Sequence, residues 1–230
     1  MSAKINDNGK YQVAIIDYEM GNMFSVDHAC KFVGLNSIIT KDKDVILNSD
    51  AAILPGVGAF GNCKDNLNRL DLISPIKDFV SSGKPFLGIC LGLQLLFTES
   101  EEFGYSKGLN LVEGNVVKFP NTSTDGKTLK VPQIGWNHIY EPKNENHWSN
   151  SILKDTTSKE FMYFVHSYYV KPTNEKDILT MTNYVGIEYC SGVKKNNITA
   201  FQFHPEKSGI EGIKIYKNWS SEIQKNKEKI

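Results

Sequence analysis

Up to about residue 97, the chain alternates short apolar runs with segments whose apolar residues recur at helical spacing. The run at residues 13–16 is apolar throughout and ends at Asp17, which is typical of a strand buried on both faces. Residues 26–33 then carry apolar side chains at helical spacing, and Gly34 lies where such a helix would end. Strands that alternate with helices predict a parallel sheet covered by helices on both sides. Further strands are predicted at residues 37–40, 51–54 and 85–89, and further helices at residues 72–80 and 91–97.

The rest of the chain is richer in strand-like segments, which polar turns separate. We expect these strands to extend the sheet in antiparallel orientation. An amphipathic segment at residues 213–223 predicts a closing helix. The predicted fold class is therefore α/β, with a mixed and mostly parallel sheet flanked by helices and with antiparallel strands added in the C-terminal half. The later strands are predicted at residues 116–119, 129–134, 161–170, 178–181, 187–190 and 198–203, and surface loops at residues 121–127 and 141–150.

Length and composition favour one large domain. The chain has 230 residues, of which 40% are hydrophobic, and this is enough for one well-filled core. We place the domain at residues 11–224, after a polar N-terminal extension at residues 1–10 and before a Lys-rich polar tail at residues 225–230. The tail has the pattern of a solvated helix end.

Charge, hydropathy and cysteine spacing argue against several classes of protein. Lys and Arg together number 26, as do Asp and Glu, so there is no electrostatic basis for binding nucleic acid or an anionic membrane. No apolar run in the sequence approaches the roughly 20 residues that span a bilayer, and the N-terminus lacks the apolar stretch of a secretory signal. Cys30, Cys63, Cys90 and Cys190 are scattered without a Cys-x-x-Cys pair, which indicates neither disulfides nor a zinc site. We therefore expect a cytoplasmic protein with no metal and no cofactor.

The sequence Gly-Ile-Cys-Leu-Gly at residues 88–92 lies between a predicted strand and a predicted helix. This is the context of a nucleophile elbow, in which flanking glycines permit a tight turn and the central side chain stands clear of the backbone. The N-terminus of the following helix would also favour the thiolate form of Cys90. A free cysteine is more often a small buried apolar residue. The strand–turn–helix context favours the nucleophile.

A nucleophilic cysteine needs a base, and the sequence Phe-His-Pro-Glu at residues 203–206 supplies a candidate. Pro205 biases His204 towards an extended conformation. Residues two apart on an extended segment point the same way, so Glu206 can orient the imidazole of His204 or stabilise its charge. The plainer interpretation is a surface histidine beside an unrelated glutamate. The preceding strand and the presence of Cys90 favour a catalytic pair.

A glycine-rich loop at residues 55–61 follows the predicted strand that ends at Leu54. Small residues allow backbone N–H groups to approach a ligand, so this loop could form an oxyanion hole together with the N–H of Leu91. A plain turn is the commoner meaning of such a loop. It does not fit a phosphate-binding P-loop, because no Gly-Lys-Ser/Thr follows it.

Three motifs resemble the class I (triad) glutamine amidotransferases in their order and spacing. They are Pro-Gly-Val-Gly at 55–58, Gly-Ile-Cys-Leu-Gly-Leu-Gln at 88–94 and Phe-His-Pro-Glu at 203–206. The resemblance extends from Asp17 to about Trp219 and implies the single-domain fold of that class. Within it, the stretches at 17–22, 132–137 and 164–168 are similar to the glutaminase subunits of imidazole glycerol phosphate synthase.

The resemblance implies a role for each matching residue. Cys90 would attack the carboxamide carbon of L-glutamine, and His204 would accept the thiol proton and later protonate the departing ammonia. Glu206 would position His204. The resemblance assigns the oxyanion hole to the backbone N–H groups of Val57, Gly58 and Leu91, and substrate binding to Gln94, Glu102, His166, Ser167 and Tyr168. For His166, plain packing is the alternative, and we expect no proton-transfer role.

The resemblance also implies a partner, a cyclase subunit with a (β/α)₈ barrel, in a heterodimer. Ammonia would pass to this subunit and be used to form imidazole glycerol phosphate and an aminoimidazole carboxamide ribonucleotide in histidine biosynthesis. An exposed tryptophan at Trp136 would suit an interface anchor, although a large aromatic residue is usually well buried. The matching interface residues are Pro132, Trp136, Asn137, Tyr163 and Lys207.

The sequence departs from the family pattern at Glu19, where glycine is usual. If the turn there needs a positive φ, glutamate would be strained. Polar residues at 121–128 and 141–150 also enlarge the chain. These departures leave open a paralogue that supplies ammonia for acetamidino-sugar formation in surface polysaccharide biosynthesis. Two other classes to consider are a cysteine peptidase and a catalytically silent docking subunit.

Overall fold

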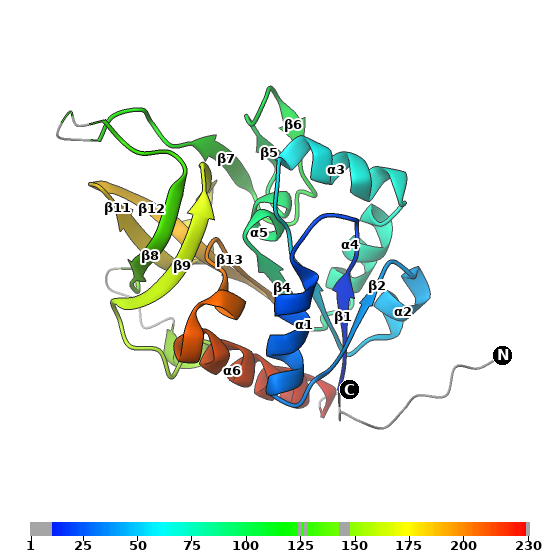
Figure 1. Cartoon of the computed structure of the whole chain (residues 1–230). Helices are drawn as coiled ribbons and strands as arrows, with labels where there is room; N and C mark the ends of the chain where they lie inside the picture. Colours follow the sequence, from blue (N-terminus) through cyan, green and yellow to red (C-terminus); the bar gives the residue numbers. More distant parts are fainter. Residues whose placement is uncertain (1–10, 124–125, 127, 143–147, 229–230) are drawn as a thin grey trace.

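The computed structural model describes residues 11–123, 126, 128–142 and 148–228. The predicted N-terminal extension, residues 124, 125, 127 and 143–147 of the two predicted loops, and the last two residues of the predicted tail lie outside the described residues. The first part of the chain alternates strands with helices as expected (Figure 1). Its elements are β1 (Gln12–Ile16), α1 (Met23–Phe32), β2 (Asn36–Thr40), α2 (Lys43–Asn48), β3 (Ala51–Leu54), α3 (Phe60–Arg69), α4 (Ile73–Ser81), β4 (Phe86–Ile89) and α5 (Leu91–Leu95).

Strands dominate the rest of the described chain until the closing helix, which runs on to Lys227. The strands are β5 (Glu99–Ser100), β6 (Ser106–Lys107), β7 (Gly114–Lys118), β8 (Gln133–Ile139), β9 (Glu160–His166), β10 (Tyr168–Pro172), β11 (Ile178–Tyr184), β12 (Ile187–Lys195) and β13 (Ile198–Phe201). The helical elements are the short 3-10 turns η1 (Trp148–Asn150), η2 (Glu175–Asp177) and η3 (Pro205–Lys207), and the helix α6 (Gly209–Lys227).

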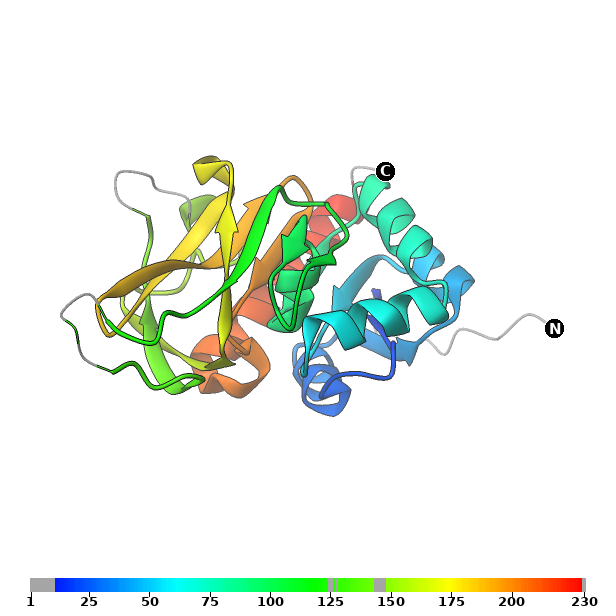
Figure 2. The same cartoon turned by 90° about the horizontal axis from the view of Figure 1, so that it is seen from above.

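The main sheet has the order β2-β1-β3-β4-β13-β12-β10-β7-β5-β6, and β11 pairs with β12. Strands β2, β1, β3, β4 and β13 are parallel. Strands β12, β11, β10 and β7 pair in antiparallel fashion, and in Figure 2 they lie on the opposite side of the molecule from α2 and α3. The predicted fold class is therefore confirmed.

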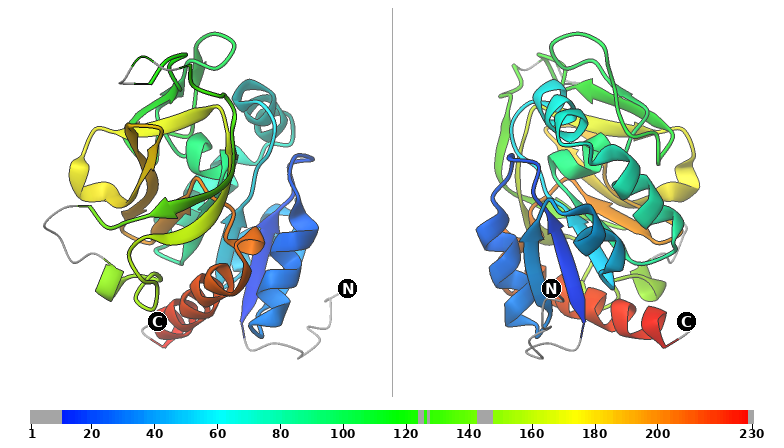
Figure 3. Two further views of the ribbon diagram at one scale, coloured as in Figure 1. Left: turned by 60° about the vertical axis from the view of Figure 1, so that its left-hand side comes forward. Right: turned by 90° about the vertical axis from the view of Figure 1, so that its right-hand side faces the viewer.

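Two buried clusters line the two faces of the sheet. On one face, β1 side chains pack with α1 and α6, two helices from opposite ends of the chain that lie together (Figure 3). On the other face, the alternate β1 side chains pack with α2, α3, α4 and α5. None of the helices in the described part of the chain is long and apolar enough to cross a membrane.

Several boundaries differ from the sequence prediction. The strand expected at 129–134 begins only at Gln133, because Pro132 has no N–H for a ladder. The strand expected at 161–170 is two strands, broken at Ser167, whose carbonyl accepts a hydrogen bond from the N–H of Phe119. The pair β8–β9 forms a separate two-stranded sheet instead of extending the main one, and β13 is parallel to β4, not antiparallel.

The prediction also missed two helices. Helix α2 has only six residues, too few to show helical periodicity, although the side chain of Asp42 caps it by accepting hydrogen bonds from Asp44 N and Val45 N. Helix α3 buries Phe60, Cys63 and Leu67 at helical spacing, but they stand among polar residues.

The topology gathers the chemically interesting segments at one edge. The turn at residues 17–22, the loop at residues 55–59, Cys90 and residues 202–206 follow β1, β3, β4 and β13, respectively. Because these strands are parallel, their carboxyl ends meet at the same edge of the sheet, where ligands bind in open α/β folds.

Candidate active site

Cys90 occupies the tight turn between β4 and α5. Its φ of 55° lies in the left-handed region, which is costly for a residue other than glycine and is found at nucleophile elbows. Its N–H donates to the carbonyl of Phe201 at 2.7 Å, which ties the turn to β13. The neighbouring strands and loops leave no room for larger side chains at the flanking glycines: a Cβ at Gly92 would stand 1.8 Å from Leu54 O. The predicted strand–turn–helix is present.

His204 and Glu206 form a buried pair beside the cysteine. His204 Nδ1 lies 2.8 Å from Glu206 Oε1, and both side chains are almost completely buried. Burial disfavours the imidazolium, but the charge and polar contact of the Cys90 sulfur, together with Glu206, raise the pKa of His204 to about 10. Nε2 makes no hydrogen bond of normal geometry to a described residue. The structure thus brings Cys90, His204 and Glu206 together, with one ring nitrogen held and the other available for proton transfer.

A cavity of about 340 Å³ opens at Cys90. It gathers every residue that the sequence analysis assigned to the oxyanion hole or to the substrate. Its lining consists of Val57, Gly58, Cys90, Leu91, Gln94, Glu102, Pro132, Val165, His166, Ser167 and Tyr168. A cavity of this size suits a small amino acid.

The candidate oxyanion donors lie at one side of this cavity. Gly58 has a φ of 101°, which glycine adopts without strain. The N–H of Leu91 donates to Gly56 O at 3.3 Å. An oxyanion at this position would therefore share or replace a long hydrogen bond from Leu91 to the loop.

The polar groups at the base of the cavity form a chain that includes a residue missed by the sequence analysis. Gln202 is fully buried, and its Nε2 lies 3.7 Å from the Cys90 sulfur. Its Oε1 accepts from Gln94 Nε2 at 3.0 Å, and Gln94 Nε2 also donates to Tyr168 O at 3.0 Å. Gln202 directly follows β13, which ends at Phe201, and the chain bends at residues 202 and 203. The direction of its side chain therefore depends on the fold, and strand alternation in the sequence does not give it.

Glu102 supplies the negative charge of the cavity. Its Oε2 accepts a hydrogen bond from the N–H of Phe60 at 2.6 Å, at the start of α3. Partial burial raises the pKa of Glu102, and this hydrogen bond opposes the shift. A carboxylate in this position can bind the ammonium group of an amino acid.

His166 lies in the cavity wall as a neutral imidazole. Nδ1 donates to Tyr168 O at 2.8 Å, because a carbonyl can only accept, and Nε2 lies 3.2 Å from Tyr189 Oη. Burial is the main cause that lowers the pKa of His166 to about 4; the hydrogen bond to Tyr168 opposes it and the charge of His204 adds to it. The hydrogen bonds and the lowered pKa support a positioning role for His166, not proton transfer.

We expect acid to destabilise the fold through His166. The unfolded chain protonates this imidazole near the ordinary histidine pKa of 6.5, whereas the folded chain does so only near 4. The neutral His166 therefore contributes fully to the free energy of unfolding above pH 6.5, and this contribution is lost as the pH falls towards 4. At pH 5 the loss is about 2 kcal/mol. In His166→Gln, the free energy of unfolding should therefore fall about 2 kcal/mol less between pH 7 and pH 5 than in the wild type. Urea titrations at both pH values measure the free energy of unfolding. Equal decreases in the variant and the wild type would contradict the prediction. The contribution of His204 is the same in both proteins and cancels in the comparison.

Several residues expected at a partner interface lie close to His204 or to the cavity at Cys90. Trp136 is 55% exposed, so the alternative that it belongs to the core is wrong. Its ring meets that of Tyr163 edge-on at 6.0 Å, and Tyr163 lies 6.5 Å from the ring of His204. Lys207 is exposed directly after Glu206, and Pro132 lines the cavity. Asn137 Nδ2 donates to Asn183 O at 2.9 Å.

Comparison with known proteins places this site in context. The family model described as "Glutamine amidotransferase class-I" matches residues 14–221. The chain is 44% identical to "Imidazole glycerol phosphate synthase subunit HisH" of Geobacter metallireducens, over 90% of this chain and 97% of that protein. It is 42% identical to the protein of the same description from Aquifex aeolicus, over 93% and 98%.

Solved structures share the fold at low sequence identity. The structure titled "Structure of PurLQS from Thermotoga maritima" aligns with a TM-score of 0.70 and 16% identity, over 93% of this chain and 99% of that one. The structure titled "Crystal structure of glutamine amidotransferase" aligns with a TM-score of 0.68 and 15% identity, over 92% and 98%.

Proposed function

Because this chain belongs to the class-I glutamine amidotransferases, and within them to the HisH subunits of imidazole glycerol phosphate synthase, we propose that it hydrolyses L-glutamine through Cys90, His204 and Glu206. The observation that carries the proposal is the buried pair of His204 and Glu206 beside Cys90, whose side chain lines a cavity of about 340 Å³. Glu206 holds the opposite ring nitrogen at 2.8 Å. A buried cysteine with a buried imidazole and carboxylate is the arrangement that nucleophilic catalysis needs.

The first half-reaction forms a thioester. His204 takes the proton of Cys90, and the sulfur attacks the carboxamide carbon of glutamine. The N–H groups of Leu91 and of the Val57–Gly58 segment stabilise the negative oxygen of the tetrahedral intermediate. His204 then protonates the amide nitrogen, and the C–N bond breaks to leave ammonia and a γ-glutamyl thioester.

The second half-reaction releases glutamate. A water molecule attacks the thioester as His204 accepts one of its protons, and the second tetrahedral intermediate collapses with loss of the cysteine sulfur. Glutamate leaves and the proton returns to Cys90. Glu102 binds the ammonium group of the substrate, Gln94 helps to hold it, and His166, Ser167 and Tyr168 line its pocket.

We propose that the ammonia passes to a cyclase subunit with a (β/α)₈ barrel. The relatives of this chain are named as subunits of imidazole glycerol phosphate synthase, which favours the histidine pathway over amidation of a surface sugar. The buried side chains of Cys90, His204 and Glu206 and the cavity of about 340 Å³ argue against a silent docking subunit. An apolar surface beside the triad fits a partner: Ile134, Trp136, Phe161 and Val185 are each close to half exposed or more.

Glutamate release tests the proposed activity. Chain and cyclase are mixed in equal amounts with glutamine, and glutamate is measured through a coupled dehydrogenase. Steady release of glutamate from free glutamine, with no cleavage of peptides, is expected. No release with or without the cyclase would support the docking subunit, and peptide cleavage would support the peptidase.

Truncating Trp136 should weaken the complex with the cyclase. An exposed aromatic anchor commonly contributes about 2 kcal/mol or more to an interface, so Trp136→Ala is expected to raise the dissociation constant roughly 30-fold or more. Ile38→Ala is the control, because Ile38 is an exposed apolar residue on β2, the end strand of the main sheet, and is not among the proposed interface residues. Isothermal titration with the cyclase measures both. Equal affinities for the two variants would remove Trp136 from the interface.

A further inference from the structure

The turn at residues 17–22 contains a glutamate in a conformation that suits glycine. Glu19 has a φ of 66°, in the left-handed region that disfavours a side chain. Both polar groups of the peptide that joins Tyr18 to Glu19 are held by hydrogen bonds. Glu19 N donates to Asp17 Oδ1 at 2.9 Å, and the carbonyl of Tyr18 accepts from Asn66 Nδ2 at 3.1 Å. The strain expected from the sequence is therefore present, and the contacts of the Glu19 side chain can offset it.

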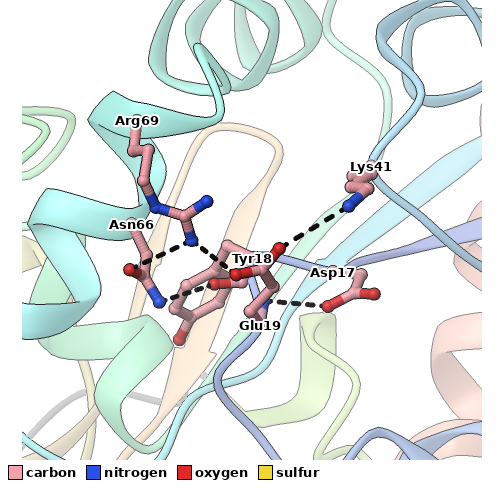
Figure 4. Close-up of polar contacts among 6 residues, drawn as sticks. All are labelled: Asp17, Tyr18, Glu19, Lys41, Asn66 and Arg69. Carbon is pink, nitrogen blue, oxygen red and sulfur yellow. Dashed lines mark hydrogen bonds and ion pairs between the residues drawn. The ribbon is translucent and has the colours of Figure 1, made fainter.

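The carboxylate of Glu19 forms ion pairs with two cations that come from different parts of the chain (Figure 4). Arg69 Nη2, at the end of α3, lies 2.5 Å from Glu19 Oε2, and Lys41 Nζ, just after β2, lies 3.6 Å from Oε1. The hydrogen bond and the charge of Arg69, with a smaller contribution from Lys41, lower the pKa of the Glu19 carboxyl. The carboxylate thus joins the outer side of the turn to α3 and to the segment after β2.

The inner side of the same turn packs directly on the loop at residues 55–59. Tyr18 is completely buried, and its hydroxyl donates to Pro55 O at 2.7 Å. A Cβ built on Gly56 would lie 2.4 Å from that hydroxyl and 2.9 Å from Leu91 Cβ, so the loop fills the space between the turn and α5. A Cβ on Gly58 would lie 2.8 Å from Met20 Cε. The turn therefore sets where this loop can lie.

We propose that Glu19 is a positioning residue for glutamine hydrolysis: its ion pair with Arg69 holds the turn, and the turn places the backbone of Val57 and Gly58 against the reacting carbonyl. The inference rests on the proposed function, because it assigns an oxyanion role to the loop. Oxyanion donors act on the transition state more than on bound substrate. Disturbing the turn should consequently lower kcat and leave KM nearly unchanged.

A double-mutant cycle on kcat tests the pair. The variants are Glu19→Gln, Arg69→Gln and the double variant, each assayed in the complex with the cyclase. Loss of a whole oxyanion donor costs about 10²- to 10³-fold in kcat. Because the pair of Glu19 and Arg69 is about half exposed, each single variant should cost only about 3- to 5-fold. The double variant should be no slower than either single variant, because both remove the same interaction. KM for glutamine should stay within about twofold.

Further variants separate positioning from stability. Glycine adopts a positive φ freely, so Glu19→Gly should keep or raise the unfolding temperature while kcat falls as in Glu19→Gln. Arg69→Lys, which keeps the charge, should restore part of kcat. Lys43→Gln is the matched control, because it breaks the exposed pair of Lys43 with Asp71 just past the end of α3 without touching the turn. Its kcat should equal that of the wild type.

The outcomes distinguish this inference from the proposed function. Unchanged kcat in both single variants, or additive losses in the double variant, would overturn the role of Glu19 while wild-type glutamine hydrolysis still stands. Loss of ammonia-dependent synthesis in the same proportion would show a general structural effect and would also overturn it. A wild-type complex that does not hydrolyse glutamine would refute the proposed function itself.

Discussion

In a complex of Cys90→Ala with the cyclase, glutamine-dependent synthesis should fall by about 10⁴-fold or more, while synthesis from added ammonia should continue at the wild-type rate. The loss is large because the C–N bond is broken only after the sulfur has attacked, and no other cysteine lines the cavity described here. Ammonia-dependent synthesis survives because it takes place on the partner. Both rates come from one assay of imidazole glycerol phosphate formation, with glutamine or an ammonium salt as the nitrogen source.

Cys30→Ala is the matched control for this experiment. Cys30 is also a free, buried cysteine, but it lies on α1 among apolar side chains, and burial raises the pKa of its thiol. Its removal should leave both activities unchanged. Parallel loss of the two activities in Cys90→Ala would mean that Cys90 is a structural residue.

The second large effect is expected in His204→Ala, which should lose much more glutamine hydrolysis than Glu206→Gln. We expect His204→Ala to lower glutamine hydrolysis by about 10³- to 10⁴-fold, because the sulfur loses its proton acceptor and the ammonia its proton donor. Glu206→Gln should cost about 10- to 10²-fold, because a glutamine oxygen can still accept the Nδ1 proton of His204 but carries no charge. Steady-state kcat measured with the cyclase present gives both numbers.

The thermal stability of both variants has to be measured alongside their activity. Glu206 is buried against His204, so thermal unfolding must show that each variant is folded at the assay temperature. Equal kinetic losses in folded His204→Ala and Glu206→Gln would indicate that Glu206 does more than orient and stabilise the imidazole.

Local features of the site were predictable from the sequence because the causes are local. Glycines on both sides of Cys90 indicate a tight turn, and Pro205 indicates an extended approach for His204. These two segments meet only because β13 pairs in parallel with β4. The expectation that β13 joined the sheet antiparallel was wrong, since the apolar pattern of a strand contains no information about the direction of its neighbour.

Non-local contacts also explain what the sequence analysis missed. The strain at Glu19 was foreseeable from the residue type, but its pairing with Arg69 depends on how α3 packs beside the turn. Gln202 looked like the end of a core strand, but the chain bends directly after β13 and its side chain lies beside the cysteine. The interruption between β9 and β10 at Ser167 lies within an apolar run, and there the Ser167 carbonyl accepts a hydrogen bond from the distant N–H of Phe119.

Covalent labelling tests the central claim most directly, namely that the sulfur of Cys90 attacks the side-chain carbonyl of glutamine. The reagent is a glutamine analogue in which a chloromethyl ketone replaces the carboxamide; the thiolate displaces chloride and forms a stable C–S bond. Peptide mass mapping after partial inactivation should find a single adduct on Cys90, formed in proportion to lost glutaminase activity and prevented by excess glutamine. Inactivation with the adduct on another residue, or with Cys90 unmodified, would contradict the account.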